Sequence, residues 1–112
     1  MPNVSQETQE KINELQMAEQ TLQSYLNQKQ AFQSQKLEIE SALKELENTN
    51  SAYKIIGNIM IKNSKDDLKK DLDEKNERMS LRIKSIEKQE NSLKEKTQAI
   101  QQDILKNIEK SD

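Results

Sequence analysis

The chain has 112 residues, of which 34% are charged and 31% hydrophobic, with one glycine, one proline and no tryptophan. An ordinary globular domain is about 45–50% apolar and about 7% glycine. This chain therefore has too few apolar side chains to fill a rounded core and too few glycines to make many turns. Its composition is typical of the long helices of coiled coils.

The residue types that are missing exclude several classes of function. The chain has no cysteine and no histidine, which excludes thiol nucleophiles, disulfides, the usual zinc sites and imidazole catalysis. The net charge of −2 disfavours nucleic acid as a partner, because phosphate binding needs a concentrated basic surface. Apolar runs are too short to span a bilayer, and no signal peptide is expected. We predict no catalytic residues, no metal, no other cofactor and no membrane association.

Residues 5–49 carry apolar side chains at the heptad spacing of a coiled coil. Lys29 and Lys36 interrupt one of the two apolar series, and we interpret them as register-setting or snorkelling residues that loosen the middle of this helix. The first series contains Leu15, Leu22 and Leu43, and the second contains Ala18, Tyr25, Phe32, Ile39 and Leu46.

Residues 52–62 combine β-branched and aromatic side chains around the only glycine of the chain. Gly57 and Asn58 are placed as the two central residues of a β-hairpin turn, of type II′ or type I′. The alternative is one helix that runs through Ile55 to Ile61. It would put the lone glycine at the centre of that helix and is disfavoured.

Residues 65–109 form a second helix, with Ser64 as a capping residue and Asp67 three residues later. If the chain turns at Gly57-Asn58, facing residues have numbers that sum to 115, and the heptad series of the two helices then meet. The predicted fold is all-α dominated: an antiparallel two-helix coiled coil with a central β-hairpin, in a single domain of residues 1–112. The unbroken series of the second helix is Leu72, Met79, Ile86, Leu93 and Ile100.

The predicted hairpin is apolar on both faces, and a sheet of this kind must be covered on both sides. A two-stranded hairpin is marginal by itself, and its edges favour further pairing. We predict that hairpins from several chains join into an oligomeric β-barrel hub from which the helical arms project. The alternative is a hairpin that packs against the bases of its own helices. One face holds Ile56, Ile59 and Ile61, and the other holds Tyr53, Ile55 and Met60.

Further apolar residues lie near both ends of the chain, which the hairpin brings together at the arm tips. A two-helix arm buries only a narrow stripe, so these side chains remain partly exposed, as at a binding surface. The alternative is that they only widen the seam between the helices. They are Val4, Ile12, Met17, Leu105 and Ile108.

Three segments carry the most distinctive pattern of the chain: Tyr53-Lys54-Ile55-Ile56-Gly57-Asn58-Ile59-Met60-Ile61-Lys62, Asp67-Leu68 and Arg82-Ile83-Lys84-Ser85-Ile86-Glu87-Lys88-Gln89-Glu90. Most specifically in these segments, and also in length and layout, the chain closely resembles the beta subunits of archaeal prefoldins. The resemblance implies a cytoplasmic, ATP-independent chaperone, a holdase that captures unfolded client proteins at its arm tips and passes them to a group II chaperonin. It also implies a hetero-hexamer of two alpha-type and four beta-type subunits.

By position, the resemblance implies two functional surfaces. The substrate-binding surface at the tips comprises Val4, Ile12, Leu15, Ile104, Leu105 and Ile108, and the oligomerisation hairpin comprises Tyr53, Ile55, Ile56, Gly57, Asn58, Ile59, Met60 and Ile61.

An alternative function is a structural coiled-coil tether or adaptor, which does not require a hairpin apolar on both faces. An enzyme is disfavoured, because nothing gathers the acids and lysines in a pocket.

Overall fold

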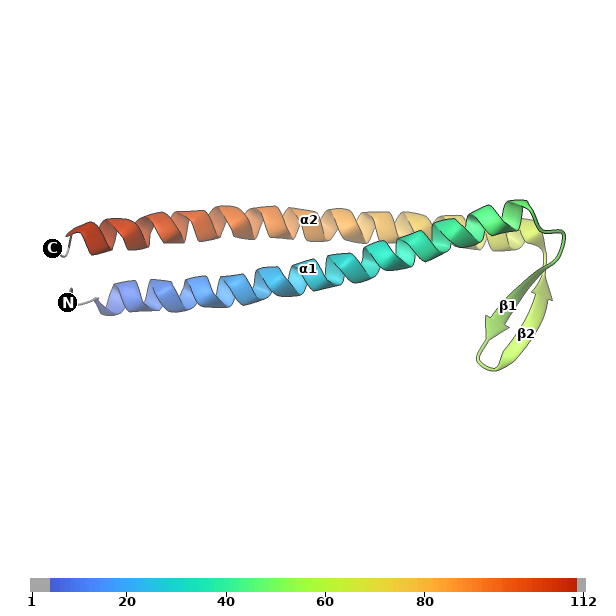
Figure 1. The fold of residues 1–112 in the computed structure, drawn as a ribbon, viewed down its shortest axis with the longest axis horizontal. Helices are drawn as coiled ribbons and strands as arrows, with labels where there is room; N and C mark the ends of the chain where they lie inside the picture. Colours follow the sequence, from blue (N-terminus) through green and yellow to red (C-terminus); the bar gives the residue numbers. More distant parts are fainter. Residues whose placement is uncertain (1–4, 111–112) are drawn as a thin grey trace. The chain divides into compact units, whose positions relative to one another are not determined.

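The computed structural model describes residues 5–110 and confirms the predicted fold class (Figure 1). The helix predicted for residues 5–49 ends earlier, at Glu47, and each of the other segments extends one residue further than predicted. Along the chain the elements are α1 (Gln6–Glu47), β1 (Ala52–Ile56), β2 (Ile59–Asn63) and α2 (Lys65–Lys110).

The structure consists of two compact parts. The terminal part contains the described residues 5–29 and 85–110, and the hairpin part contains residues 30–84. Each of the two long helices contributes to both parts. The organisation of residues 1–112 as a single domain stays a prediction.

In the hairpin part, β1 and β2 pair antiparallel with Ile56 opposite Ile59 and Tyr53 opposite Lys62. This is the register in which residue numbers sum to 115, as the sequence predicts. Gly57 has a φ of 59°, and no other residue of the described chain has a positive φ. A type I′ turn needs positive φ at both central residues, whereas type II′ needs it only at the first. The turn is therefore of type II′.

Side chains near the hairpin satisfy the backbone groups that the helix ends leave unpaired. The backbone N–H of Asp67 donates to Ser64 Oγ at 3.1 Å, which is the predicted cap of α2. At the other side of the hairpin, Lys65 Nζ donates to the carbonyl oxygen of Glu47, the last residue of α1, at 3.1 Å. These bonds fix the points at which the helices stop and the strands can begin.

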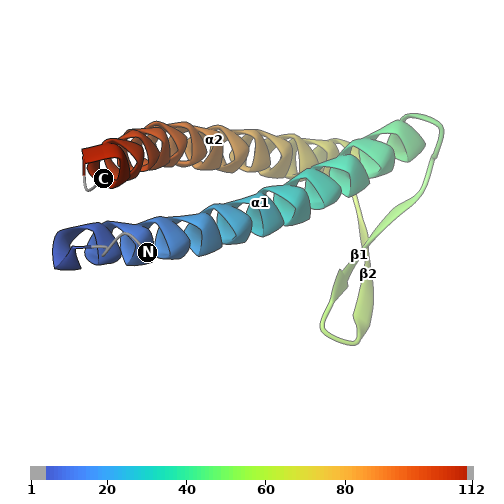
Figure 2. The ribbon, with the colours of Figure 1, turned by 60° about the vertical axis from the view of Figure 1, so that its left-hand side comes forward.

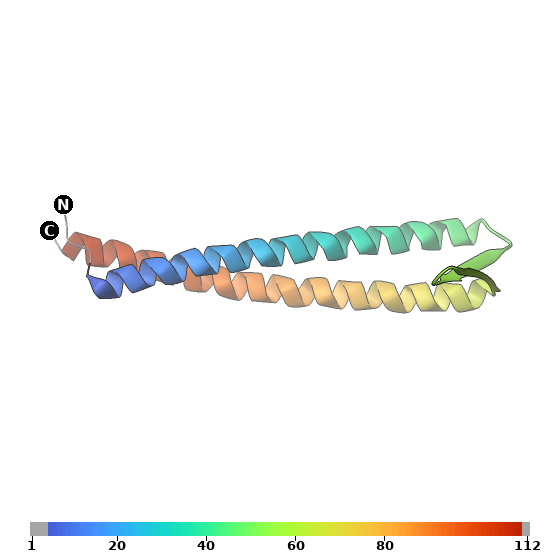
Figure 3. The same ribbon diagram turned by 90° about the horizontal axis from the view of Figure 1, so that it is seen from below.

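In the terminal part, the segments of α1 and α2 run antiparallel beside each other (Figures 2 and 3). Three ion pairs join them: Lys11 to Asp103 at 3.7 Å, Lys96 to Glu14 at 3.6 Å, and Lys29 to Glu90 at 2.7 Å. The predicted heptad seam lies between the helices and also takes in polar residues. The buried residues of this part are Thr8, Ala18, Ile86, Glu90, Thr97, Ile100 and Ile104.

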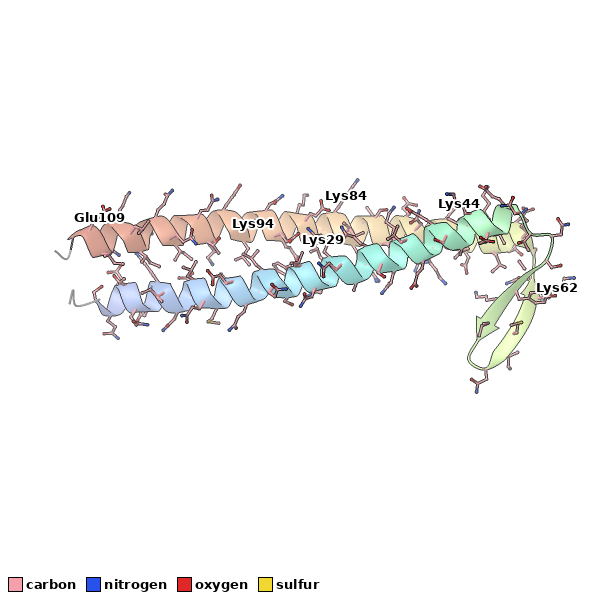
Figure 4. All side chains as sticks on the ribbon, viewed as in Figure 1. Lys29, Lys44, Lys62, Lys84, Lys94 and Glu109 are labelled. Carbon is pink, nitrogen blue, oxygen red and sulfur yellow. The ribbon has the colours of Figure 1, made fainter. Side chains whose placement is uncertain are left out.

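Two polar residues of the otherwise apolar seam, Lys29 and Glu90, contact each other in the terminal part. Lys29 Nζ donates to Glu90 Oε1 at 2.7 Å, and the Glu90 residue is only 5% exposed. Figure 4 marks Lys29 on the side of α1 that faces α2. The hydrogen bond from Lys29 to Glu90 raises the pKa of the Lys29 ammonium above its usual 10.5, although partial desolvation opposes this shift. The second interrupting lysine, Lys36, instead pairs within its own helix, with Glu40.

Candidate protein-binding surfaces

The hairpin exposes its large apolar side chains on both faces. The exposed fraction ranges from 44% for Ile61 to 68% for Ile55. The paired strands fix which side chains share a face. The first face contains Ile56, Ile59 and Ile61, and the second contains Tyr53, Ile55 and Met60.

The base of the hairpin contacts the helices of the hairpin part. Ala52 is buried, and Lys54 Nζ lies 3.3 Å from Asp71 Oδ2 of α2. On the opposite face of the hairpin, Lys62 points away from the helices (Figure 4). The alternative packing of the hairpin against its own helices thus applies to this base and leaves the isoleucines beyond it exposed.

Beside the base of the hairpin lies an open hollow of about 470 Å³. Aliphatic side chains of both helices form much of its wall, and Tyr53 and Ile55 of β1 form its rim. A hollow with apolar walls next to an apolar strand can accept a side chain from another protein chain. Its aliphatic wall residues are Ala42, Leu46, Ala52, Leu68 and Leu72.

The structure divides the predicted tip residues into two groups. Ile104 is buried in the seam and is only 9% exposed, because its heptad position points it at α1. Ile12 and Leu15 are half-buried, whereas Leu105 is 60% exposed and Ile108 is 38% exposed. Val4 lies outside the described residues. The predicted set therefore contains both seam residues and surface residues, and its role in client binding stays a prediction.

Three of the predicted tip residues and Gln101, from both helices, form a hollow that we call the tip hollow. It has a volume of about 260 Å³ and is lined by Leu15, Gln101, Ile104 and Leu105. Ile104 thus contributes a wall of this hollow although it is buried. None of the four lining residues carries a charge.

Sequence reasoning overlooked three exposed leucines outside the seam. Leu26 and Leu37 on α1 and Leu81 on α2 are exposed although they are large and apolar. None of the three belongs to either of the two seam series. A leucine outside both series was the sign by which the sequence could have marked them as exposed. Reasoning from the sequence also overlooked the pair of Lys29 with Glu90, because the residue that faces Lys29 by number is Ile86.

The described residues expose large apolar side chains on the hairpin and near the ends of the helices. Within residues 5–110 no cluster of three acids could hold a metal ion. The same range contains no helix with the length and apolar character needed to cross a membrane. The exposed apolar side chains and the two hollows beside them can contact apolar groups of other proteins.

Three comparisons with known proteins agree with one another. The sequence model of the family described as "Prefoldin subunit" matches residues 9–111. A protein named prefoldin subunit beta from Methanospirillum hungatei is 34% identical over 112 residues, which cover 97% of this chain and 93% of the relative. Its counterpart from Archaeoglobus fulgidus is 33% identical and covers 93% of this chain and 92% of the relative.

The likeness extends to a solved structure. The crystal structure of the prefoldin beta subunit from Thermococcus strain KS-1 matches with a TM-score of 0.91 and 31% sequence identity. The match covers 96% of this chain and 97% of that chain. It therefore includes both helices and the hairpin.

Proposed function

The chain belongs to the prefoldin family as a beta-type subunit, and on this premise we propose that it works as part of an ATP-independent holdase. Family membership makes it a chaperone-type subunit that assembles with other prefoldin subunits. The proposed assembly contains two alpha-type and four beta-type subunits, whose hairpins form β-barrel hubs. Its proposed clients are unfolded proteins, which it passes to a group II chaperonin in the cytoplasm. The proposed activity involves no catalysis.

The single observation that carries the proposed assembly is the hairpin with apolar residues exposed on both faces. Fully burying one Leu, Ile, Phe or Met side chain is worth about 1.5–3 kcal/mol. Six such large side chains on two five-residue strands, including Tyr53, therefore give a strong drive toward a partner sheet. A tether or adaptor made of a two-helix coiled coil would not need this surface.

The proposed client binding rests on the apolar side chains of the terminal part. One hollow of about 260 Å³ gives only weak binding. Several arms that hold one client raise the total avidity without any new contact, since the later binding events are intramolecular. Release needs no nucleotide, because the chaperonin can compete for the client or for the arm tips.

The first experiment is a native mass measurement of this chain, alone and mixed with an alpha-type prefoldin subunit. We expect a hexamer with two alpha-type and four beta-type subunits in the mixture. A monomer or a simple dimer in both samples would contradict the proposed hub.

The second experiment measures aggregation of a denatured client in the presence of the assembly. We compare the full-length chain with a chain trimmed of residues 1–12 and 103–112. We expect the trimmed assembly to protect the client much less, because it lacks most of the tip surface. Equal protection by both assemblies would remove the tips from the proposed mechanism.

A further inference from the structure

The two helices of the terminal part meet along a seam, and each helix has two flanks beside it. In heptad letters, Leu15 and Ile104 occupy position a, which places Glu14 and Lys96 at position g of their own helices. Glu14 and Lys96 are paired at 3.6 Å, so the g flanks of α1 and α2 lie on the same side of the seam. The e flanks therefore meet on the opposite side. We call these two sides the g side and the e side.

The g side of the terminal part carries charges that bridge the helices. Besides the pair of Glu14 with Lys96, the g-position residue Asp103 pairs with Lys11 at 3.7 Å. A second hollow on this side, beside Tyr25, is lined by Lys88 and Lys96. An uncharged client segment that bound here would have to displace water from these charged groups, which costs free energy.

The e side carries the tip hollow and has a different chemistry. Leu105 at position b and Gln101 at position e line the hollow, together with the seam residues Leu15 and Ile104. Ile12 and Ile108 occupy position e on the two helices and so lie on the same side. Apolar groups thus gather on one side of the tip, beside an amide and not beside an ion pair.

The size and chemistry of the tip hollow define what it can accept. Its volume of about 260 Å³ is below the roughly 300–1,000 Å³ of pockets for drug-sized ligands. It is large enough for an aliphatic side chain. The amide of Gln101 offers two donors and an acceptor, which match the C=O and N–H groups of an extended peptide.

We propose that each arm captures its client through the e side of the tip only, by taking an aliphatic side chain of an uncharged, extended segment into the tip hollow. This inference rests on the proposed holdase function and specifies its client surface. Because the lining carries no charge, the hollow does not discriminate by the sign of a client's charge. The segments it selects against are those with charged side chains at the point of contact, which would lose hydration without gaining a partner.

The test uses two exposed residues that are alike except for their side of the seam. Leu105 is 60% exposed at the e side, and Met17 is 68% exposed at position c, which adjoins the g side. We compare L105S and M17S in hexamers assembled with the alpha-type subunit. Both substitutions lie within helices and outside the seam, so their effects on helix propensity are similar. Native mass measurement and the melting temperature verify that both assemblies are intact.

The readout is the concentration of assembly that halves the aggregation of a denatured client. We expect L105S to require at least about fivefold more assembly, because its loss recurs in every arm that holds the client. Met17 is among the apolar residues that the sequence places near the arm tips, but its side chain adds no contact to the hollow. One-sided capture therefore predicts that M17S stays within about twofold of the unchanged protein, whereas binding by all tip residues predicts a loss like that of L105S. An equal loss in both variants overturns one-sided capture and leaves tip binding intact. No loss in either variant overturns one-sided capture, and the trimmed assembly then decides whether the tips bind clients at all.

A second measurement identifies the occupant of the hollow. A photo-crosslinking phenylalanine derivative replaces Gln101 in one assembly and Met17 in a matched assembly. We expect the derivative at position 101 to crosslink to the added denatured client, at aliphatic segments, and the one at position 17 to give far less crosslinked client. Crosslinks from position 101 to residues 1–4 of the same chain, or to a second copy of the chain in place of the client, would overturn the proposal.

Discussion

The hairpin part and the terminal part both expose apolar side chains, but they do so in different settings. In the hairpin, β pairing fixes large side chains on two faces of a sheet, and each is between 44% and 68% exposed. In the terminal part, a few apolar residues lie beside a seam that already buries its own core. A rigid two-faced surface suits one defined partner, whereas a small hollow beside a seam suits many partners with one weak contact each.

The two parts also differ in how they treat polar groups within the helix seam. In the terminal part, the buried Glu90 carboxylate accepts a hydrogen bond from Lys29 at 2.7 Å. In the hairpin part, Asn76 Oδ1 is buried without a hydrogen-bond partner, and Lys36 pairs with Glu40 of its own helix. The polar groups of the terminal seam therefore specify how α1 lies against α2. In the hairpin part, Lys36 and Asn76 make no such contact across the seam, and the polar group of α2 that lies against α1 is instead Arg82, over the Phe32 ring at 5.7 Å from its centroid.

The largest expected effect comes from making the hairpin surface acidic. In the double variant I55E/M60E, two opposite residues of one hairpin face become carboxylates that the proposed hub would have to bury. Burying charges without partners costs several kcal/mol, so we expect no hexamer with the alpha-type subunit by native mass measurement.

The matched control for the hairpin is L81E. Leu81 is 59% exposed, which is within the range of the apolar hairpin residues, but it lies on α2. We expect this variant to assemble normally. Loss of the hexamer in L81E as well would show that added negative charge, and not the hairpin surface, governs assembly.

The next effect concerns the polar contact within the terminal seam. The variant E90L leaves Lys29 in the seam without its carboxylate, so we expect the melting temperature to fall by several degrees. The double variant K29L/E90L continues the apolar seam and should melt at or above the temperature of the unchanged protein. Circular dichroism on heating measures both. A double variant that melts as low as E90L would show that the ion pair itself stabilises the seam.

The sequence predicts the fold well because two independent periodicities agree. The heptad series on either side of Gly57 meet in the register that the hairpin pairing of Ile56 with Ile59 also has. Local turn chemistry and long-range packing thus specify the same structure. The sequence alone does not distinguish turn types I′ and II′. Asn tolerates a positive φ, and the sequence does not reveal whether the φ of Asn58 is positive or negative.

The candidate surfaces were less predictable, because residue type alone does not tell seam from surface at the tips. Ile104 and Leu105 are adjacent aliphatic residues, yet one is buried and the other exposed. Their heptad letters separate them, but only after the register is known. The contact of Lys29 with Glu90 could not be predicted even with the register known. The residue that faces Lys29 by number is Ile86, and the lysine side chain reaches one turn further along α2.

A smaller effect is expected at the turn that joins the strands. A Cβ atom added at Gly57 would have no atom within 4 Å, so the cost of G57A comes from its positive φ alone. The first central residue of a type II′ turn has a backbone conformation that residues with a side chain rarely adopt, at a cost of about 1–3 kcal/mol. We expect faster hydrogen exchange of the hairpin amides and a higher concentration for hexamer formation. N58A is the control, since Asn58 has a negative φ and should tolerate alanine.

The smallest expected effect is the pH dependence of the pair between Lys29 and Glu90. The hydrogen bond to Glu90 raises the folded-state pKa of Lys29 above 10.5, so the folded protein holds this proton more tightly than the unfolded chain does. The stabilisation is therefore fully present below pH 10.5 and is lost as the pH rises through the folded-state pKa. The Lys29 side chain is 21% exposed, and solvent screening keeps the effect modest.

The pH effect is isolated by comparing the unchanged protein with K29L/E90L, because the other lysines titrate in both proteins. We expect the melting temperature of the unchanged protein to fall more steeply above pH 10.5 than that of the double variant. Between pH 7 and pH 9 the difference between the two proteins should stay constant. Parallel curves above pH 10.5 would mean that Lys29 has the same pKa in the folded and unfolded chain. The contact with Glu90 would then orient the helices without stabilising the charged lysine.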